Sequence, residues 1–445
     1  MLRRTSAILG LDRTILLMAA THFAVDGYSN IYAPLLPLLI PRLDLSLAAA
    51  GALTMCFQIA ASVSQLGFGH VADRWKPRVF LFAGPVVCIV VLSAIGLAGS
   101  PLMLGLVLVA GGLGAAAFHP PAAALVHRLA GERQGFAMAL HITGGSLGFS
   151  LGPLLFAPVI QRMGLHWSPV VALPGLVWIW LCLRRVPSPE ETHTSASAGG
   201  FRALRPYAFN LTLLYLIVVL RTLASLSFAT FVPVMLTRRG VSVSGAAAAI
   251  SLYLFASSMG GFTGGPLADK FGPKRVIALS LVAAVPFLVA APLLHGWSFL
   301  VMLAAGGFFL QSTLPVNVTF GHQVAPVSAA TVSLMMGFAW GTGGLAVPLV
   351  GMLADRVDIA PALMIMGLSP LAAAACALRL PGGTSAARDG RSRRACAHGR
   401  TLSVGQRART GRRGGIRDVG GACKLLRSSH AAVWYDPRMP EARKA

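Results

Sequence analysis

The sequence has few charged residues, and acidic ones are especially rare. Only 11% of its 445 residues are charged, and 14 Asp and Glu stand against 37 Lys and Arg. Soluble domains carry about 25% charged residues, so this chain lacks the side chains needed for an ordinary water-exposed surface. Its 55% of apolar residues indicate that its main solvent is lipid.

Cysteine is also scarce, and the six Cys residues show no disulfide or metal-ligand spacing. The chain further lacks a nucleophile with a neighbouring base, and it has no phosphate-binding loop outside a membrane segment. These absences argue against an enzyme. We therefore expect no cofactor and no metal site.

Apolar segments long enough to cross a bilayer follow one another along the chain. A helix needs about 20 apolar residues to span the hydrocarbon layer, and twelve segments qualify, whereas the alternation typical of a β-barrel is absent. The segments are 14–40, 46–70, 79–98, 101–125, 135–160, 166–184, 209–236, 244–268, 276–294, 297–320, 329–353 and 359–380. The predicted fold is an all-α integral membrane protein with twelve transmembrane helices.

The orientation follows from the loops, because Lys and Arg are retained on the cytoplasmic side. Basic residues gather in one alternating set of loops, for example Arg74, Arg78 and Arg184, whereas the other set holds few. Both termini are thus expected in the cytoplasm.

The tail 381–445 has 15 Lys and Arg against 4 Asp and Glu and lacks apolar periodicity. We therefore expect it to be disordered. We predict no nucleic-acid partner, because no aromatic platform accompanies its charge.

One cassette occurs twice. The residues from Gly69 to Arg78 recur from Gly265 to Lys274, and the register persists beyond them. Parallel copies in a membrane chain indicate two similar bundles around a pseudo-two-fold axis, with a site between them. The predicted domains are a six-helix bundle at 1–185, a cytoplasmic linker at 186–208, a second six-helix bundle at 209–380 and the tail at 381–445.

Longer motifs resemble a known family. The stretches His22 to Asp26, Phe118 to Pro120, Gly144 to Pro153 and Gly337 to Gly344, together with the repeated cassette, look like the fosmidomycin-resistance branch of the major facilitator superfamily. The resemblance implies proton-driven export of small drugs across the bacterial cytoplasmic (inner) membrane. It also implies that the repeated cassette latches the two halves when the cytoplasmic side is shut. The latch residues would be Gly69, Asp73, Arg74, Arg78, Gly265, Asp269, Lys270 and Lys274.

Asp26 is the only carboxylate deep inside a predicted span, and buried ionisable residues in membranes mark functional sites. His22 and Asn30 lie four residues before and after it, so the three share one helix face. That face either lines a cavity for substrate or protons, or forms polar contacts with another helix.

Arg221 is the matching buried cation of the second half, at the position equivalent to His22. It forms either a structural pair with Asp26 or a site for substrate anions or proton coupling. His119, Gln311 and Asn317 complete the predicted cavity, and Pro120 and Pro121 are expected to open the helix near His119.

Three glycines recur at intervals of four residues, at Gly144, Gly148 and Gly152, directly before Pro153. Small residues at this spacing allow another membrane helix to approach closely.

The favoured function is secondary active transport by alternating access, with a small drug or metabolite exported and the proton gradient as its energy source. The alternatives are proton-coupled uptake of an organic anion with Arg221 as anchor, and a membrane sensor with a transporter fold. Expected partners are the lipid bilayer, the substrate and protons, and the protein is expected to be a monomer.

Overall fold

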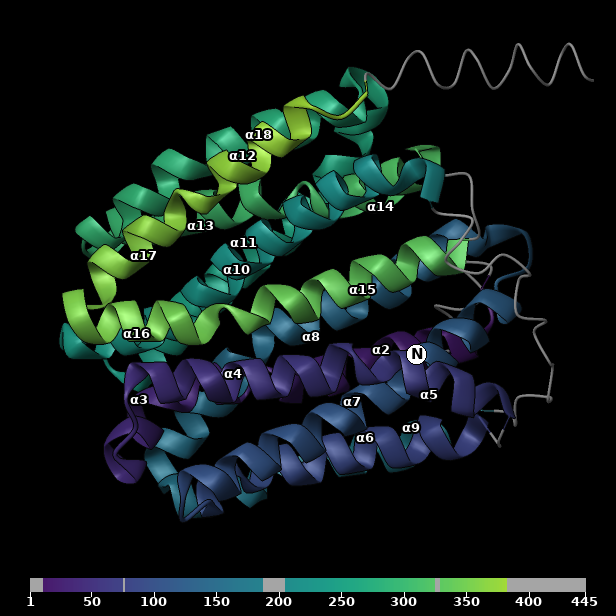
Figure 1. Ribbon diagram of the computed structural model, residues 1–445. Helices are drawn as coiled ribbons and strands as arrows, with labels where there is room; N and C mark the ends of the chain where they lie inside the picture. Colours follow the sequence, from purple (N-terminus) through teal and green to yellow (C-terminus); the bar gives the residue numbers. More distant parts are fainter. Residues whose placement is uncertain (1–10, 75–76, 187–204, 325–328, 382–445) are drawn as a thin grey trace, which may run out of the picture. The chain divides into compact units, whose positions relative to one another are not determined.

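The computed structural model describes residues 11–74, 77–186, 205–324 and 329–381, and every regular element in these ranges is a helix (Figure 1). In this part of the chain, eleven helical segments are long and apolar enough to cross a membrane. They coincide with eleven of the twelve predicted segments, so the predicted all-helical membrane fold is confirmed. The difference concerns the first segment.

The helices of the first half are α2 (Arg13–Ser29), α3 (Tyr32–Leu43), α4 (Leu47–Ser62), α5 (Ser64–Arg74), α6 (Pro77–Ser93), α7 (Pro101–Leu129), α8 (Gln134–Met163) and α9 (Ala172–Leu183). Those of the second half are α10 (Ala208–Arg238), α11 (Val243–Phe271), α12 (Pro273–Ala290), α13 (Gly296–Gln311), α14 (Leu314–Val324), α15 (Ala329–Leu345), α16 (Val347–Val357), α17 (Ile359–Gly367) and α18 (Ser369–Leu378).

The first predicted span is two shorter helices, because the chain breaks between α2 and α3. Proline at position i cannot donate to the carbonyl of residue i−4 and clashes with it. Pro34 therefore disfavours a continuous helix at Asn30, which is where α2 ends. The same proline argument fails elsewhere: α7 continues through Pro120 and Pro121, so the expected opening of the helix beside His119 is wrong.

The two halves repeat the same local start signal. Ser46 caps α4 by accepting a hydrogen bond from the Ala49 amide at 3.0 Å, and Ser242 caps α11 by accepting one from Gly245 at 3.1 Å. A serine side chain in this position satisfies one of the free amides of the first turn. The shared signal fixes the equivalent starts of the second membrane segment in each half.

Glycine positions set how closely α8 approaches α2. A Cβ atom added at Gly144, Gly148 or Gly152 would meet the backbone oxygen of Ala19, Phe23 or Gly27, respectively. The equivalent helices of the second half, α10 and α15, meet at Gly343, whose added Cβ would lie 3.0 Å from the Val219 oxygen. Each half therefore contains a close contact between two helices that is possible only because the residue at the contact is glycine.

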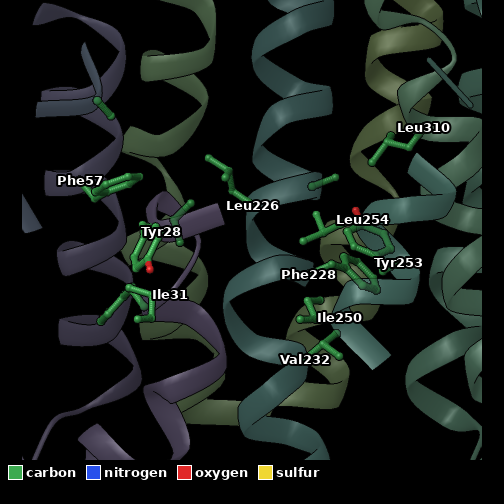
Figure 2. Close-up of a cluster of buried hydrophobic side chains, with 14 of the residues drawn as sticks. Tyr28, Ile31, Phe57, Leu226, Phe228, Val232, Ile250, Tyr253, Leu254 and Leu310 are labelled. Atoms are coloured by element: carbon green, nitrogen blue, oxygen red, sulfur yellow. The ribbon is translucent and has the colours of Figure 1, made fainter. Parts of the chain in front are cut away.

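Apolar side chains fill the space between these helices. Figure 2 shows Phe228 and Tyr253 side by side, with ring centroids 6.4 Å apart. Leu226 lies on the side of α10 that faces Phe57 and Tyr28 of the first half. Burial of such side chains is continuous across the described helices.

Hydrogen bonds between the halves gather at one end of the helices, which we call the Ser46 end because Ser46, Gly164, Ser242 and Asp358 lie there. The Leu47 and Ala48 amides of α4 donate to the two carboxylate oxygens of Asp355 on α16, both at 2.9 Å. Ser244 at the start of α11 donates its amide to Gln161 of α8 at 2.8 Å. In Figure 1 the Ser46 end is at the left, where α3, α4 and α16 meet.

Two further cross-half hydrogen bonds lie deeper along the helices. Leu154 donates its amide to the Ser251 hydroxyl at 3.2 Å, and the hydroxyls of Thr54 and Thr230 are 3.4 Å apart. The hydrogen bonds described between the halves, each of which joins two described residues, thus lie in the half of the helices nearer the Ser46 end. The structure is closed at that end.

Candidate functional site

Asp26 lies between two histidines. His22, one turn earlier on α2, places its Nε2 3.2 Å from Asp26 Oδ2, and His119 of α7 places its Nε2 3.5 Å from Asp26 Oδ1. The side chains keep exposed fractions of 13% for His22, 21% for Asp26 and 23% for His119. A carboxylate enclosed by two imidazoles, with access retained, can hold and release a cation.

The protonation of His22 is constrained by its other neighbour. His22 Nδ1 lies 2.9 Å from the backbone oxygen of His141 on α8. A carbonyl oxygen can only accept a hydrogen bond, so Nδ1 carries the hydrogen. In neutral His22 the Nε2 atom therefore presents a lone pair to the Asp26 carboxylate, and this contact becomes attractive only when a proton or another cation lies between the two atoms.

Helix α8 holds α2 on both sides of Asp26. The His141 oxygen accepts from His22, and the Phe149 oxygen accepts from Asn30 Nδ2 at 2.9 Å. Between them lies Gly145, whose added Cβ would stand 2.6 Å from Asp26 Oδ2. The polar face of α2 is thus partly a helix-packing surface, as one of the two interpretations of the sequence states, while Asp26 itself makes no hydrogen bond to α8.

The His141 ring completes a cluster of imidazoles in the first half. Its centroid lies 4.3 Å from that of His22, and the His22 ring lies 5.0 Å from that of His119. His141 is buried, whereas the other two histidines are partly exposed. The rings that contact Asp26 directly are therefore the accessible ones.

Arg221 lies fully buried on α10 in the second half. Its Nη2 donates to Thr222 Oγ1 at 3.2 Å, and its guanidinium carbon lies 5.1 Å from the Trp340 ring centroid, within range of a cation–π contact. Its Nε and Nη1 have no hydrogen-bond partner among the described residues. A buried guanidinium with two free donors is costly unless an anion binds it.

Other buried polar atoms of the second half also lack partners within the described residues. They are the Tyr253 hydroxyl, which lies close enough to Arg221 for electrostatic interaction, Gln311 Oε1, and both side-chain polar atoms of Asn317. They come from α11, α13 and α14, and each of these helices packs against α10. The second half thus provides an Arg together with neutral donors and acceptors for a polar ligand.

The structural pair between Asp26 and Arg221 is not formed. Within the described residues, the ion-pair partners of Asp26 are His22 and His119, and no carboxylate pairs with Arg221. The reason is the packing of the helices: α2 contacts α6, α7 and α8, whereas α10 contacts α3, α11 and α15. The predicted cavity residues therefore form two groups, one in each half.

The predicted latch residues lie at the opposite end from Ser46, and several of them contact their own half. Lys274 donates its ammonium to the Leu380 oxygen after α18 at 2.6 Å, and Asp269 is exposed. Lys270 and Arg78 lie over the rings of Phe271 and Phe82, respectively.

The glycines of the two cassettes have open surroundings. A Cβ at Gly265 would meet nothing within 4 Å, and one at Gly69 would lie 3.6 Å from Pro120. The side chains of Asp73 and Arg74 lie outside the described part, so the latch stays a prediction.

Comparison with known proteins decides the family. The family model of the Major Facilitator Superfamily matches residues 18–297 and 214–410. The chain belongs to the Major Facilitator Superfamily. It is therefore a multi-pass membrane transporter, and its family is one of transporters and not of enzymes.

Relatives and solved structures agree with this membership. The chain is 28% identical to the fosmidomycin resistance protein of Escherichia coli (strain K12) over 80% of this chain and 89% of that protein. It is 24% identical to the gallate transporter of Pseudomonas putida over 73% and 81% of the two chains. It also shares the fold of a bacterial homologue of the human lysosomal transporter Spinster, in an inward-facing and occupied conformation, with a TM-score of 0.69, 18% identity and coverage of 82% and 96%.

Sequence reasoning missed the residues that complete both groups. Gly145 leaves room for the contact between His22 and Asp26, and Trp340 and Tyr253 lie beside Arg221. Gly145 lies within the family-like stretch Gly144 to Pro153 but falls outside the regular glycine spacing, so the spacing did not indicate it. Trp340 lies within the family-like stretch Gly337 to Gly344, which did not indicate a contact with Arg221, and Tyr253 carries no local signal.

Proposed function

We propose that this transporter exchanges protons for a small organic anion and exports the anion from the bacterial cytoplasm across the inner membrane, with both termini in the cytoplasm. The observation that carries the proposal is the separation of charges between the halves. The first half holds a carboxylate between two histidines, and the second half holds a buried guanidinium whose Nε and Nη1 have no hydrogen-bond partner among the described residues.

The anion would bind at Arg221. Carboxylates and phosphonates match the planar fork of a guanidinium, and charge-assisted hydrogen bonds of this kind are stronger than neutral ones. Trp340 supports the guanidinium plane from one side, while Tyr253, Gln311 and Asn317 offer partners for uncharged groups of the substrate. This arrangement favours an anion with a polar body.

The proton would bind between Asp26 and a histidine. A proton on His22 Nε2 turns its contact with Asp26 into an ion pair, and His119 offers a second acceptor at a similar distance. His22 stays oriented throughout because its Nδ1 hydrogen bond to α8 does not depend on this proton. The site can therefore load and unload without rearranging α2.

Coupling between the two sites would run through the conformation of the halves. Because Asp26 and Arg221 do not pair, protonation of one cannot release the other directly. Each ligand would instead bias which end of the helices is closed, and a ligand shifts such an equilibrium only by its difference in affinity for the two states. Alternating access supplies these states, and the hydrogen bonds at the Ser46 end stabilise one of them.

The names of two relatives support the class of substrate and the direction. One relative is named for fosmidomycin resistance, and export of a drug from the cytoplasm is one way in which a membrane transporter gives resistance to it. The other is named for gallate, an aromatic carboxylate. Uptake of an organic anion is the second candidate, because the name of the gallate relative gives a substrate and no direction of transport.

The experiment is transport by purified protein in inside-out proteoliposomes with an acidic lumen. The substrate panel contains small carboxylates, small phosphonates and neutral analogues of the same size. We expect anions to accumulate in the lumen and neutral analogues not to. Accumulation only with the opposite pH gradient would establish uptake, and transport of neutral analogues alone would contradict the anion site.

The matching variants are Arg221→Ala and Arg221→Lys. Each hydrogen bond to a charged group contributes about 1.5–3 kcal/mol, so Arg221→Ala is expected to weaken anion binding at least about tenfold. Arg221→Lys keeps the charge without the planar fork and should restore binding in part. Arg356→Gln, at an exposed arginine of α16, is the control and should bind normally. Normal anion affinity in Arg221→Ala would contradict the proposed anchor.

A further inference from the structure

We propose that His22, Asp26 and His119 also form a binding site for a divalent transition-metal ion, best matched by Zn²⁺. The sequence predicted no metal site, because its six cysteines lack ligand spacing and it contains no metal-ligand motif. The structure brings one possible ligand atom from each to within 4.8 Å of the others. The inference rests on this geometry and not on the proposed direction of transport or its substrate.

The distances already approach those of a coordinated ion. Zinc binds imidazole nitrogen at about 2.0–2.1 Å and carboxylate oxygen at about 2.0–2.2 Å, which places tetrahedral ligand atoms about 3.3 Å from one another. The Asp26 carboxylate meets each histidine near that distance, through Oδ2 at 3.2 Å from His22 Nε2 and through its other oxygen, Oδ1, at 3.5 Å from His119 Nε2.

The orientation of His22 is the one that a metal ligand needs. Histidines that bind metals usually donate their other ring N–H to a carbonyl or carboxylate, which fixes the tautomer and directs the lone pair at the metal. His22 Nδ1 makes this bond with the His141 oxygen, so its Nε2 lone pair is directed at Asp26. The same contact without a bound cation sets two lone pairs against each other.

Space and access also fit. Gly145 has no side chain that would occupy the position beside His22 Nε2 and Asp26 Oδ2. All three ligands keep partial exposure, so an ion can enter, and a three-ligand site leaves a position for water or for a ligand group. Two imidazoles and one carboxylate suit zinc, cobalt, nickel and copper, whereas Mg²⁺ and Ca²⁺ prefer oxygen ligands.

A consequence is competition between the metal ion and the proton for the same three side chains. If Asp26 and His22 carry the coupling proton, a bound Zn²⁺ would occupy its site and block proton-driven transport. Metal binding and proton coupling are separate claims, because the first is measured without any transport.

The test uses full-length protein purified with a peptide tag that contains no histidine and reconstituted in nanodiscs. Zn²⁺ is titrated by calorimetry, and Co²⁺ is titrated while its visible absorption is recorded. We expect one specific site with the absorption of nitrogen and oxygen ligands. His22→Gln, His119→Gln and Asp26→Asn should each weaken binding at least about tenfold, and Mg²⁺ should not compete.

His295→Gln, at an exposed histidine before α13, is the matched control and should bind within twofold of wild type. Equal affinity in all three ligand variants, or thiolate absorption from the cysteines, would overturn the proposal. If a ligand variant fails to fold, X-ray absorption of the zinc-loaded wild-type protein decides instead. Two imidazoles in the first coordination shell would support the site, and their absence would overturn it.

Discussion

At the scale of single residues, Asp26 and Arg221 show that two charged side chains at similar depth in a membrane protein need not form an ion pair. Both are deep in their helices, and their similar depth left a pair between them as one of two interpretations. The direction of each side chain is set by the helices packed around it, and those differ between α2 and α10. Asp26 consequently contacts histidines, and Arg221 contacts Thr222 and Trp340.

The first prediction concerns Asp26→Asn. Asparagine keeps the size of the side chain but cannot bind and release a proton, so a pH gradient should no longer drive accumulation of substrate. Exchange of substrate down its own gradient should persist, because Arg221 is untouched in the other half. The measurement is transport in proteoliposomes with and without a pH gradient.

Asp44→Asn is the control, because Asp44 is exposed in a turn with φ of 49°, a conformation that asparagine tolerates. It should be driven normally. Accumulation against a gradient by Asp26→Asn would assign proton coupling to other groups, with His22 and His119 the next to be substituted.

How far the sequence predicts this site depends on whether partners share a helix. His22 and Asp26 lie four residues apart, so their proximity follows from helical geometry. His119 is in another helix, and which helix faces which is decided by packing contacts that no local pattern encodes. The same limit explains why the first-half cluster was only partly predicted and why an Asp26–Arg221 pair remained among the interpretations.

At the scale of helices, the contact of α2 with α8 depends on glycine. We predict that Gly148→Ala destabilises the protein, because its new methyl group would meet the Phe23 backbone oxygen, which cannot move without moving α2. Overpacking of this kind costs about 1–3 kcal/mol. The midpoint of thermal unfolding in detergent should fall.

Gly135→Ala on the same helix is the matched control, since an added Cβ there meets nothing within 4 Å. Alanine favours helix over glycine, so this variant should unfold at the same or a slightly higher temperature. Equal midpoints for the two variants would show that α2 and α8 are not held at this distance in the membrane protein.

Asp355 of the second half caps the N-terminus of α4 in the first half, so this helix cap also joins the two halves. We predict that Asp355→Ala loosens the Ser46 end, because the Leu47 and Ala48 amides lose their acceptors. Loss of a helix cap costs about 0.5–2 kcal/mol, and 1–2 kcal/mol shifts a population roughly 5- to 30-fold. Hydrogen–deuterium exchange should rise at Leu47 and Ala48 and also at Ser244, which Gln161 binds.

Exchange at Ser244 separates opening of the whole end from loss of one cap. Asp358→Ala is the control, because Asp358 caps α17 within its own half by accepting from the Ile359 amide at 2.8 Å. It should leave the α4 and α11 amides unchanged. Faster exchange confined to Leu47 and Ala48 in Asp355→Ala would mean that the cap does not hold the halves together.

At the scale of the whole transporter, the proposed alternating access requires contacts between the halves at both ends of the helices. The hydrogen bonds between the halves lie toward the Ser46 end, and the repeated cassettes lie at the other end of the same helices. Under the predicted orientation, the first end faces outside and the second faces the cytoplasm. Contacts at the two ends would then stabilise opposite states of one equilibrium. Loss of the contacts at the Ser46 end should favour the state that is open there, and loss of the contacts at the cassette end should favour the state that is open at that end.

The last prediction tests this opposition with Asp73→Asn. Asp73 lies in the first cassette, so its loss should weaken the state closed on the cytoplasmic side and favour the state described here. Turnover should fall while substrate affinity changes little, and exchange at Ser244 should slow. Asp355→Ala should do the reverse, and since the residues are far apart their effects should add. The double variant should therefore return Ser244 exchange toward the wild-type rate. Failure of the double variant to compensate, or a loss of affinity alone in Asp73→Asn, would place Asp73 outside the conformational equilibrium.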